Sequence, residues 1–422
     1  MLDDDPTGAQ TLAGIRVLLS WSPARIADAL DGRPAVHLIT NSRAVSPEAA
    51  RELVGGAARD ALAGVPGAQV VLRGDSTLRG HLLEEYLAVR DATRPGEHPA
   101  LLLAPALPSA GRVTVGGVHL IERDGRRVPL HETEYARDGL FSYTDARLLR
   151  WAEQRSSGHF AAAAGRELPL VELRAGGAEA VSAALADLAG RGCPAVLAPD
   201  AETSADLELL AAGYADAVER GTAALVRCAP AFAGVLSGTT APGLVDAPHA
   251  DGDVLVVCGS YVPTSRRQLA RLVDSGRHVL VEVDAAALGS TRAAGAEIAR
   301  AAREIDARRS RGGAVVLATP AERPPGLRGL DVGERISRNL AAVVAALEKP
   351  PRVVVAKGGI TSAVTLQHGL GADEAEVVGP VVPGVSLWRA AGRRGPVDYF
   401  VVPGNVGSDD LLVGLVERVL RG

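Results

Sequence analysis

The sequence predicts an α/β protein of two domains, each with a mostly parallel sheet flanked by helices. Short runs continuous in Val, Leu and Ala alternate with helix-length stretches, a pattern typical of parallel strands covered on both faces. At 422 residues, 47% of them hydrophobic, the chain is long enough for two cores. A segment rich in Gly, Pro, Thr and Asp separates two sets of apolar runs at 236–252. We therefore predict domains at 1–235 and 253–422, joined by a linker at 236–252.

The predicted strands follow the apolar runs in chain order. Four runs precede the linker, AVHLIT, QVVLRG, ALLLA and PAVLA, and four follow it, VLVVCG, HVLVEVD, GAVVLA and RVVVAKGG. Apolar residues at steps of three and four mark a helix between the last two runs: Ile336, Leu340, Val343, Val344 and Leu347. The stretch RVTVGGVHLIERDGRRVPL alternates in the β fashion, which predicts a hairpin around Asp124 and Gly125.

The composition excludes several classes of protein. The 50 acidic and 45 basic residues give a net charge of -5 without a basic arm, so we expect no nucleic-acid partner. No apolar run approaches the ~20 residues that span a bilayer, and the acidic start is unlike a signal peptide, so we expect a cytoplasmic protein with no membrane partner. Cys193, Cys228 and Cys258 are far apart in sequence, which supports neither disulfides nor a zinc site.

The chain opens with MLDDDPTGAQT, in which the carboxylates of Asp3, Asp4 and Asp5 precede Pro6. Adjacent like charges are typical of a solvated tail. The Pro-Thr-Gly run that follows favours instead a defined turn that exposes free N–H groups where a helix begins. Both interpretations stay open on these residues alone.

Polar residues follow the predicted strand QVVLRG. The stretch GDSTLRGH places charged and hydroxyl side chains before a helix that begins near Leu82: Arg73, Asp75, Ser76, Thr77 and Arg79. Ligands bind at the carboxyl ends of strands in open parallel sheets, and these groups could hold a small hydroxy acid. The alternative is a capped helix, with Ser76 or Thr77 as the N-cap and Asp75 balancing the arginines. The two readings are about equally supported.

Glycine turns follow three predicted strands or strand ends of the second domain. The stretches are VVCGSYVPTSRRQ, VVVAKGGITS and VVPGNVGSDDLL. Paired glycines let a backbone approach a phosphate, and a helix that begins there supplies oriented N–H donors. Three such turns indicate a nucleotide pocket, although neither a Walker A sequence nor a G-x-G-x-x-G turn after a strand is present.

These motifs together resemble the four-carbon acid sugar kinase family. The blocks DDDPTGAQT, GDSTLRGH, PSAGRVTVGGVHL, TEYARDGLFSY, CGSYVPTSRRQ, KGGITS, GPVVPGVSLW and PGNVGSDDLL look like that family's successive blocks, in its order. The resemblance runs from Asp3 to about Leu412. It implies an N-terminal sugar-acid domain, a C-terminal nucleotide domain and an active site in the cleft between them.

The resemblance implies ATP-dependent transfer of phosphate to a hydroxyl of a small sugar acid, of tetronate or 3-oxo-tetronate type, with ATP and Mg²⁺ as cofactors. On the family's motifs the implied catalytic residues are Asp5 and, second, Asp4. The implied substrate-binding residues are Asp4, Arg73, Asp75, Ser76 and Arg79. The implied nucleotide-binding residues are Ser260, Lys357, Gly358, Gly359, Ile360, Thr361, Gly404 and Asn405.

For the chemistry we expect Asp5 to accept the proton of the attacking hydroxyl. Arg73 and Arg79 are expected to grip the substrate carboxylate, while another carboxylate helps to hold Mg²⁺, for which no protein ligand is assigned. The sequence is compatible with a homodimer but does not determine the oligomeric state.

Departures from the family pattern motivate an alternative to the kinase, chiefly the short start and Val364. Only two residues precede Asp3, which predicts a shortened first strand, and Ile360 and Val364 stand where relatives often carry acidic residues. The alternative is a catalytically impaired protein of the same fold that binds nucleotide and sugar acid in a regulatory role. A dehydrogenase is disfavoured because the dinucleotide fingerprint is absent.

Overall fold

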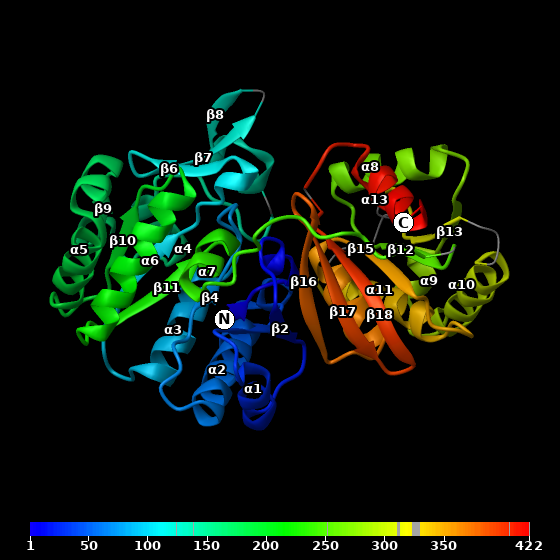
Figure 1. Cartoon of the computed structure of the whole chain (residues 1–422), viewed down its shortest axis with the longest axis horizontal. Coiled ribbons are helices and arrows are strands. Elements are labelled where there is room, and N and C mark those ends of the chain that lie inside the picture. The colour runs from blue at the N-terminus through cyan, green and yellow to red at the C-terminus, as the bar shows by residue number, and fades with distance from the viewer. Residues whose placement is uncertain are drawn as a thin grey trace. The chain divides into compact units, whose positions relative to one another are not determined.

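The computed structural model describes all residues except Asp124, Asp138, Asp251, 310–312, 323–329, Asn405 and Gly422. The chain divides into two compact units (Figure 1). The first comprises Met1–Asp4 and Trp21–Thr240, and the second comprises Asp5–Ser20 and Ala241–Gly422. The chain therefore changes units between Asp4 and Asp5, whereas the predicted boundaries group residues 1–235 together.

The first unit contains a sheet of seven described strands, all paired in parallel. In spatial order the strands are β3 (Val36–Ile39), β1 (Leu2–Asp3), β4 (Leu72–Arg73), β11 (Ala224–Cys228), β5 (Ala100–Ala104), β10 (Val196–Pro199) and β9 (Arg166–Leu168). The runs AVHLIT, QVVLRG, ALLLA and PAVLA correspond to β3, β4, β5 and β10, which confirms those predictions. Every residue of β5 and β11 is buried, because helices cover both faces.

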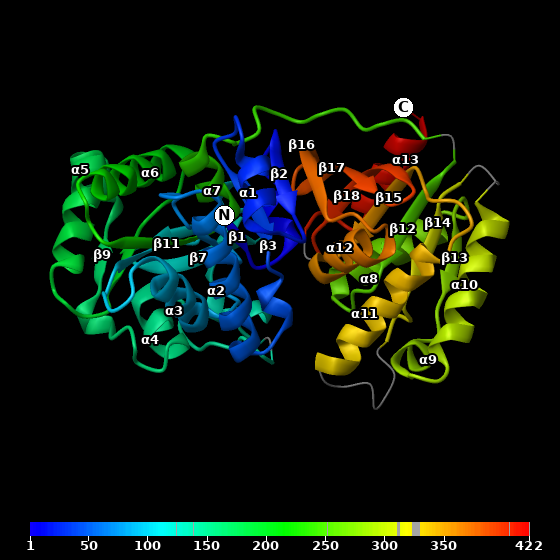
Figure 2. The same ribbon diagram turned by 90° about the horizontal axis from the view of Figure 1, so that it is seen from below.

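Helices and a small second sheet complete the first unit. The helices are α1 (Pro23–Leu30), α2 (Pro47–Gly64), α3 (Leu82–Thr93), α4 (Leu148–Arg155), α5 (Leu170–Ala189), α6 (Ser204–Glu219) and α7 (Pro230–Ser237). In Figure 2, α5 and α6 lie on one side of the sheet and α2, α3 and α4 on the other. The core packs β5, β10 and β11 against α5, α6 and α7 through residues such as Leu102, Leu185 and Phe232.

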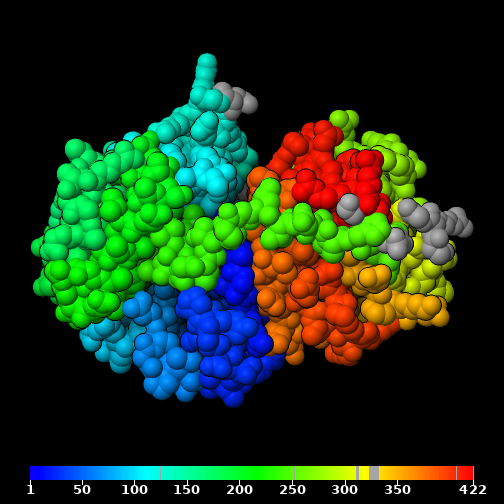
Figure 3. All heavy atoms as spheres, in the orientation of Figure 1, coloured from blue at the N-terminus to red at the C-terminus, as the bar shows by residue number. Residues whose placement is uncertain are grey.

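The predicted hairpin belongs to an antiparallel sheet of β6 (Arg112–Val115), β7 (Val118–Arg123) and β8 (Arg126–Pro129). Gly125 turns the chain with φ of +71°, a conformation that favours glycine, and Asp124 lies outside the described residues. Figure 3 shows this region projecting from the surface of the first unit.

The second unit contains a mixed sheet. In spatial order its strands are β13 (Val279–Glu282), β14 (Val315–Ala318), β12 (Val254–Cys258), β15 (Val353–Lys357), β18 (Gly395–Val402), β17 (Val385–Gly392), β16 (Glu374–Val382) and β2 (Ile15–Leu18). The pairings among β13, β14, β12 and β15 are parallel, as the four apolar runs predict, and β18, which those runs do not include, adds to β15 in parallel. The sheet then continues through β17, β16 and β2 by antiparallel pairings, which the apolar runs do not predict.

Helices cover both faces of this sheet. They are α8 (Pro263–Asp274), α9 (Ala285–Gly289), α10 (Ala294–Arg308), α11 (Leu330–Ala345), α12 (Gly359–Val364) and α13 (Leu411–Arg421). Figure 1 shows α8 and α13 on one side of the strands and α9, α10 and α11 on the other. The predicted apolar stripe from Ile336 to Leu347 is buried and belongs to α11 and the turn after it.

The segment Asp5–Ser20 belongs to the second unit because β2 pairs with β16. Ile15 lies opposite Val377 in this ladder, and the Gly14 N–H donates to the Val377 carbonyl at 2.8 Å. Ile15, Val17 and Leu18 of the strand are fully buried. In the described part of the chain, no helix combines the length and the apolar character needed to cross a bilayer.

Candidate active site

Asp3 ends β1 inside the first unit and is completely buried. Its Oδ2 lies 2.9 Å from His37 Nδ1, and its Oδ1 lies 3.3 Å from Arg73 Nε. Burial favours the neutral acid, but Arg73 and His37 outweigh it and lower the pKa of Asp3 to about 2. Burial also lowers the pKa of His37, so its ring is neutral at pH 7. Asp3 is therefore an internal anion that fixes Arg73.

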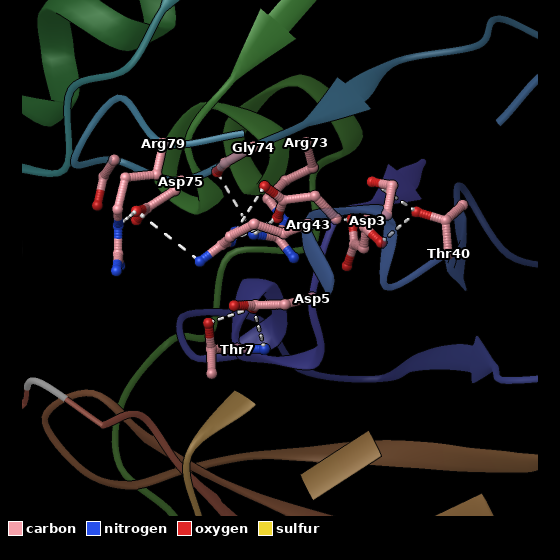
Figure 4. Close-up of polar contacts among 12 residues, drawn as sticks. Asp3, Asp5, Thr7, Thr40, Arg43, Arg73, Gly74, Asp75 and Arg79 are labelled. Carbon is pink, nitrogen blue, oxygen red and sulfur yellow. Dashed lines mark hydrogen bonds and ion pairs between the residues drawn. The ribbon is translucent and has the colours of Figure 1, made fainter. Parts of the chain in front are cut away.

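Asp4 lies one residue further and binds two arginines. Arg43 donates to both of its carboxylate oxygens, from Nη2 to Oδ1 at 2.7 Å and from Nε to Oδ2 at 3.1 Å. Arg73 Nη1 lies 3.1 Å from the same Oδ1. Figure 4 shows this gathering of charged side chains where β1 and β4 end. Because both oxygens of Asp4 are engaged, its geometry suits an anchor for arginines better than a proton acceptor.

Arg43 is the residue of this group that sequence reasoning missed. It follows β3 in a short 3-10 turn, η2 (Ser42–Ala44), and its side chain is 15% exposed. Its Nη1 also lies 3.8 Å from Asp75 Oδ2, so Arg43 links Asp4 to the next loop. The signal was present, because the letters NSR follow the predicted strand AVHLIT just as GDSTLR follows QVVLRG.

In the loop after β4, the side chain of each residue from Asp75 to Thr77 forms a hydrogen bond. Asp75 Oδ2 accepts from Arg79 Nε at 2.6 Å and from the Thr77 hydroxyl. Burial favours the neutral acid, but Arg79 and Arg43 hold the pKa of Asp75 well below its ordinary value. Ser76 Oγ accepts from Arg112 Nη1 at 2.8 Å. Neither hydroxyl caps α3, whose N-cap is His81, so that part of the capped-helix alternative is wrong, whereas Asp75 does pair with Arg79 as that alternative expects.

Arg73 is 2% exposed and engaged with Asp3 and Asp4. Its position in the core suits the support of these carboxylates more than contact with a ligand. Arg79, with 22% of its side chain exposed, keeps the more open position of the two predicted substrate arginines.

Asp5 belongs to the second unit and begins the 3-10 turn η1 (Pro6–Ala9). Its Oδ1 accepts from the Thr7 N–H at 2.8 Å and from the Thr7 hydroxyl (Figure 4). Its Oδ2 lies so near the Gly359 backbone that a Cβ built on Gly359 would be 2.8 Å from that oxygen. Asp5 is 7% exposed. The structure thus brings a predicted catalytic carboxylate against a predicted nucleotide-binding turn.

The three glycine turns of the second unit meet at one edge of its sheet, because β12, β15 and β18 are neighbours that run in parallel. A Cβ on Gly259 would lie 3.0 Å from Thr361 Oγ1, and a Cβ on Gly358 would lie 3.5 Å from the Ser260 Cβ. A Cβ on Gly404 would lie 3.7 Å from Ser260 Oγ. The predicted turns therefore form one surface.

Two further predicted nucleotide residues differ in exposure. Lys357 is fully buried, and its Nζ donates to the Pro403 carbonyl at 2.6 Å. Burial lowers the pKa of Lys357 to about 8. Ile360 is 45% exposed. Asn405 lies outside the described residues. Lys357 therefore holds the turn before Gly404 in place from inside the unit.

Two family models match successive parts of the chain. The sugar-binding N-terminal domain matches residues 1–236, and the nucleotide-binding C-terminal domain matches residues 255–412. Fold and site together thus define a protein with one sugar-binding and one nucleotide-binding domain. The chain belongs to the four-carbon acid sugar kinase family. This membership confirms the resemblance carried by the sequence blocks.

Named relatives and solved structures agree with this assignment. A D-threonate kinase of Salmonella typhimurium is 28% identical over 417 residues, which cover 91% of this chain and 89% of that kinase. A D-erythronate kinase of Heliobacterium modesticaldum is 43% identical over 103 residues, only 24% of this chain and 22% of that kinase. A Salmonella typhimurium protein described as a tRNA synthase aligns over 100% of this chain and 98% of its own, with a TM-score of 0.70 and 20% identity. At that identity the likeness shows the fold alone.

Proposed function

We propose that this protein is an ATP-dependent kinase that phosphorylates a hydroxyl of a small sugar acid of tetronate or 3-oxo-tetronate type. Family membership supports the reaction class, and the two kinases named above act on four-carbon acids. The observation that carries the proposal is the close approach of Asp5 Oδ2 to the Gly359 backbone, where a Cβ would lie 2.8 Å from that oxygen. The homodimer and the cytoplasmic location expected from the sequence stay predictions.

The second unit is the proposed nucleotide-binding part. Turns without side chains let backbone N–H groups approach phosphate oxygens closely. Ser260 and Thr361 add hydroxyls at the same edge, next to Gly358. Lys357 acts indirectly, because its ammonium is used to hold the Pro403 carbonyl.

The first unit is the proposed sugar-acid-binding part. Asp75 and Ser76 lie at the carboxyl end of β4 with Arg79, and the contacts among Asp75, Thr77 and Arg79 fix the loop. A carboxylate and hydroxyls of this kind orient the hydroxyl groups of a small acid. Asp4, Arg43 and Arg73 support the loop from the end of β1.

In the reaction, Asp5 accepts the proton of the attacking hydroxyl, since Oδ2 faces the glycine turns while Oδ1 is held by Thr7. Mg²⁺, when bound, neutralises charge on the phosphates. The Asp5 carboxylate and the Ser260 and Thr361 hydroxyls are hard oxygen donors that fit this ion. No cluster of three metal-ligating side chains occurs among the described residues, which suits an ion bound mainly by phosphate and water.

ADP release in the presence of ATP, Mg²⁺ and a panel of four-carbon acids tests the proposal. We expect D-threonate or D-erythronate to be phosphorylated, and Asp5→Asn to lower kcat by roughly 10²–10⁴-fold while binding of an ATP analogue survives. Asp187→Asn, at a carboxylate that is 53% exposed on α5, is the matched control. Saturable ATP binding without turnover on any acid would instead support the regulatory alternative. Near-normal turnover of Asp5→Asn would remove Asp5 from the mechanism.

A further inference from the structure

Arg112 is a buried cation that forms no ion pair with any of the described residues. It begins β6, and the residue is 5% exposed. Its Nη1 donates to Ser76 Oγ at 2.8 Å, and its Nε has no hydrogen-bond partner among the described residues. No carboxylate of a described residue lies within ion-pair distance of the Arg112 guanidinium. A buried guanidinium without a paired anion is costly, so such a group calls for a ligand of negative charge.

The other arginines nearby are already paired. The guanidiniums of Arg79, Arg112 and Arg123 lie 5.6, 5.9 and 5.5 Å from the centre of the Tyr135 ring. Arg79 is bound to Asp75, and Arg123 is bound to Glu134. Arg112 therefore differs from its neighbours in having no direct ion pair among the described residues, although all three face the same ring and Arg112 contributes to the lowered pKa of Asp75.

The geometry around Arg112 is fixed in advance. Ser76, which accepts its Nη1, has its own carbonyl 2.9 Å from His119 Nε2. His119 is fully buried, and its Nδ1 lies 3.0 Å from the Thr114 hydroxyl. Since a carbonyl can only accept, His119 donates from Nε2 and accepts at Nδ1. Ser76 engages only Nη1 of Arg112. The Nε–Nη2 edge of the guanidinium is the edge that can pair with a carboxylate in bidentate fashion.

We infer that Arg112 receives the carboxylate of the substrate and makes the enzyme select acids over uncharged sugars. This inference rests on the proposed function and assigns the carboxylate-binding arginine within it. Arg73, which the sequence suggested for this role, is occupied by Asp3 and Asp4. Ser76 and Asp75 then lie beside the bound acid, where they can contact its hydroxyl groups.

The test measures binding by calorimetry, using D-threonate and its uncharged amide as probes. Wild-type protein is expected to bind the acid at least about 100-fold more tightly than the amide, because a buried guanidinium is left unpaired by the amide. Arg112→Gln is expected to weaken acid binding by about 100-fold and to change amide binding by less than about 3-fold. Arg112→Lys keeps the charge and should retain part of the preference.

Arg123→Gln is the matched control, because it removes a guanidinium over the same ring and should leave the preference unchanged. An equal loss for acid and amide in both Arg112 variants would overturn the inference, since it would mean that Arg112 only supports the Ser76 loop. Failure of the acid to bind wild-type protein would overturn it as well. Binding of the acid through Arg112 without ADP formation would uphold the inference while the proposed kinase reaction fails.

Discussion

The strand ends of the two units differ in composition, with charged side chains in the first unit and glycine turns in the second. In the first unit, β1 and β4 end in carboxylates and arginines that hold one another through side chains. In the second, β12, β15 and β18 end in glycine turns, where the backbone is bare and the nearby lysine is buried. On the proposed function, side chains recognise a small charged acid in the first unit, and backbone N–H groups recognise a polyphosphate in the second.

Removing Arg73 should give the largest effect, because the first unit depends on buried charges. Arg73→Ala leaves Asp3 and Asp4 with one cation fewer in the core, and should lower the free energy of unfolding by about 3–5 kcal/mol. Urea denaturation followed by circular dichroism measures this. The control Arg51→Ala, which breaks an exposed pair with Asp91, should cost about 1 kcal/mol or less. Similar losses in the two variants would contradict the comparison.

Adding one methyl group to the second unit should disturb its backbone surface. In Gly359→Ala the new Cβ would lie 2.8 Å from Asp5 Oδ2, so Asp5 must move. We expect kcat to fall about 100-fold, because a small misplacement of a catalytic group has a cost of that order. Gly414→Ala on α13, where a Cβ meets nothing within 4 Å, is the control for turnover. Unchanged kcat in Gly359→Ala would show that the position of Asp5 is not critical.

Lys357 should make the second unit more stable at alkaline pH. Its folded pKa of about 8 lies below the ordinary value of 10.5, so between these values the unfolded chain binds the extra proton. Stability must then rise with pH across this window, by about 3 kcal/mol in full. Unfolding free energies at pH 7.5 and 9.5 should show the rise in wild-type protein. The rise should be smaller in Lys357→Met, whereas Lys349→Met, at an exposed lysine, should keep it.

Asp3 should give the first unit the opposite, acid-sensitive behaviour. Its folded pKa of about 2 lies below the ordinary 3.8, so its stabilising contribution is present above pH 4 and is lost as the pH falls towards 2. The shift corresponds to about 2 kcal/mol. The difference in unfolding free energy between wild type and Asp3→Asn should therefore shrink by that amount from pH 5 to pH 2. A difference independent of pH would show that Asp3 is not ionised in the folded protein.

Sequence reasoning found the parallel strands because continuous apolar runs reflect burial on both faces. It missed β16, where Gly379 and Pro380 interrupt the apolar pattern, and it missed β17, which pairs with β16. It also did not predict β2, since the pairing of β2 with β16 joins residues more than 350 positions apart. Such a pairing leaves no local trace.

For the site, sequence located the loops but not the direction of their side chains. The convergence of the glycine turns followed from the rule for strand ends and from the family blocks. Lys357 and Arg73 occupy the same kind of position, yet both turn inward to partners in their own unit. Arg112 lies within a quoted block, but only the structure shows that its Nε has no hydrogen-bond partner among the described residues.

The chain contains two lysines, and they differ in access to solvent. Lys349 is exposed after α11, whereas Lys357 is enclosed beneath the Pro403 carbonyl. An amine-reactive reagent should therefore modify Lys349 at once and reach Lys357 only when that edge opens transiently. Mass spectrometry can measure the rate of modification of Lys357. That rate would report how often the proposed nucleotide-binding edge opens locally, and no substitution is needed to introduce a probe.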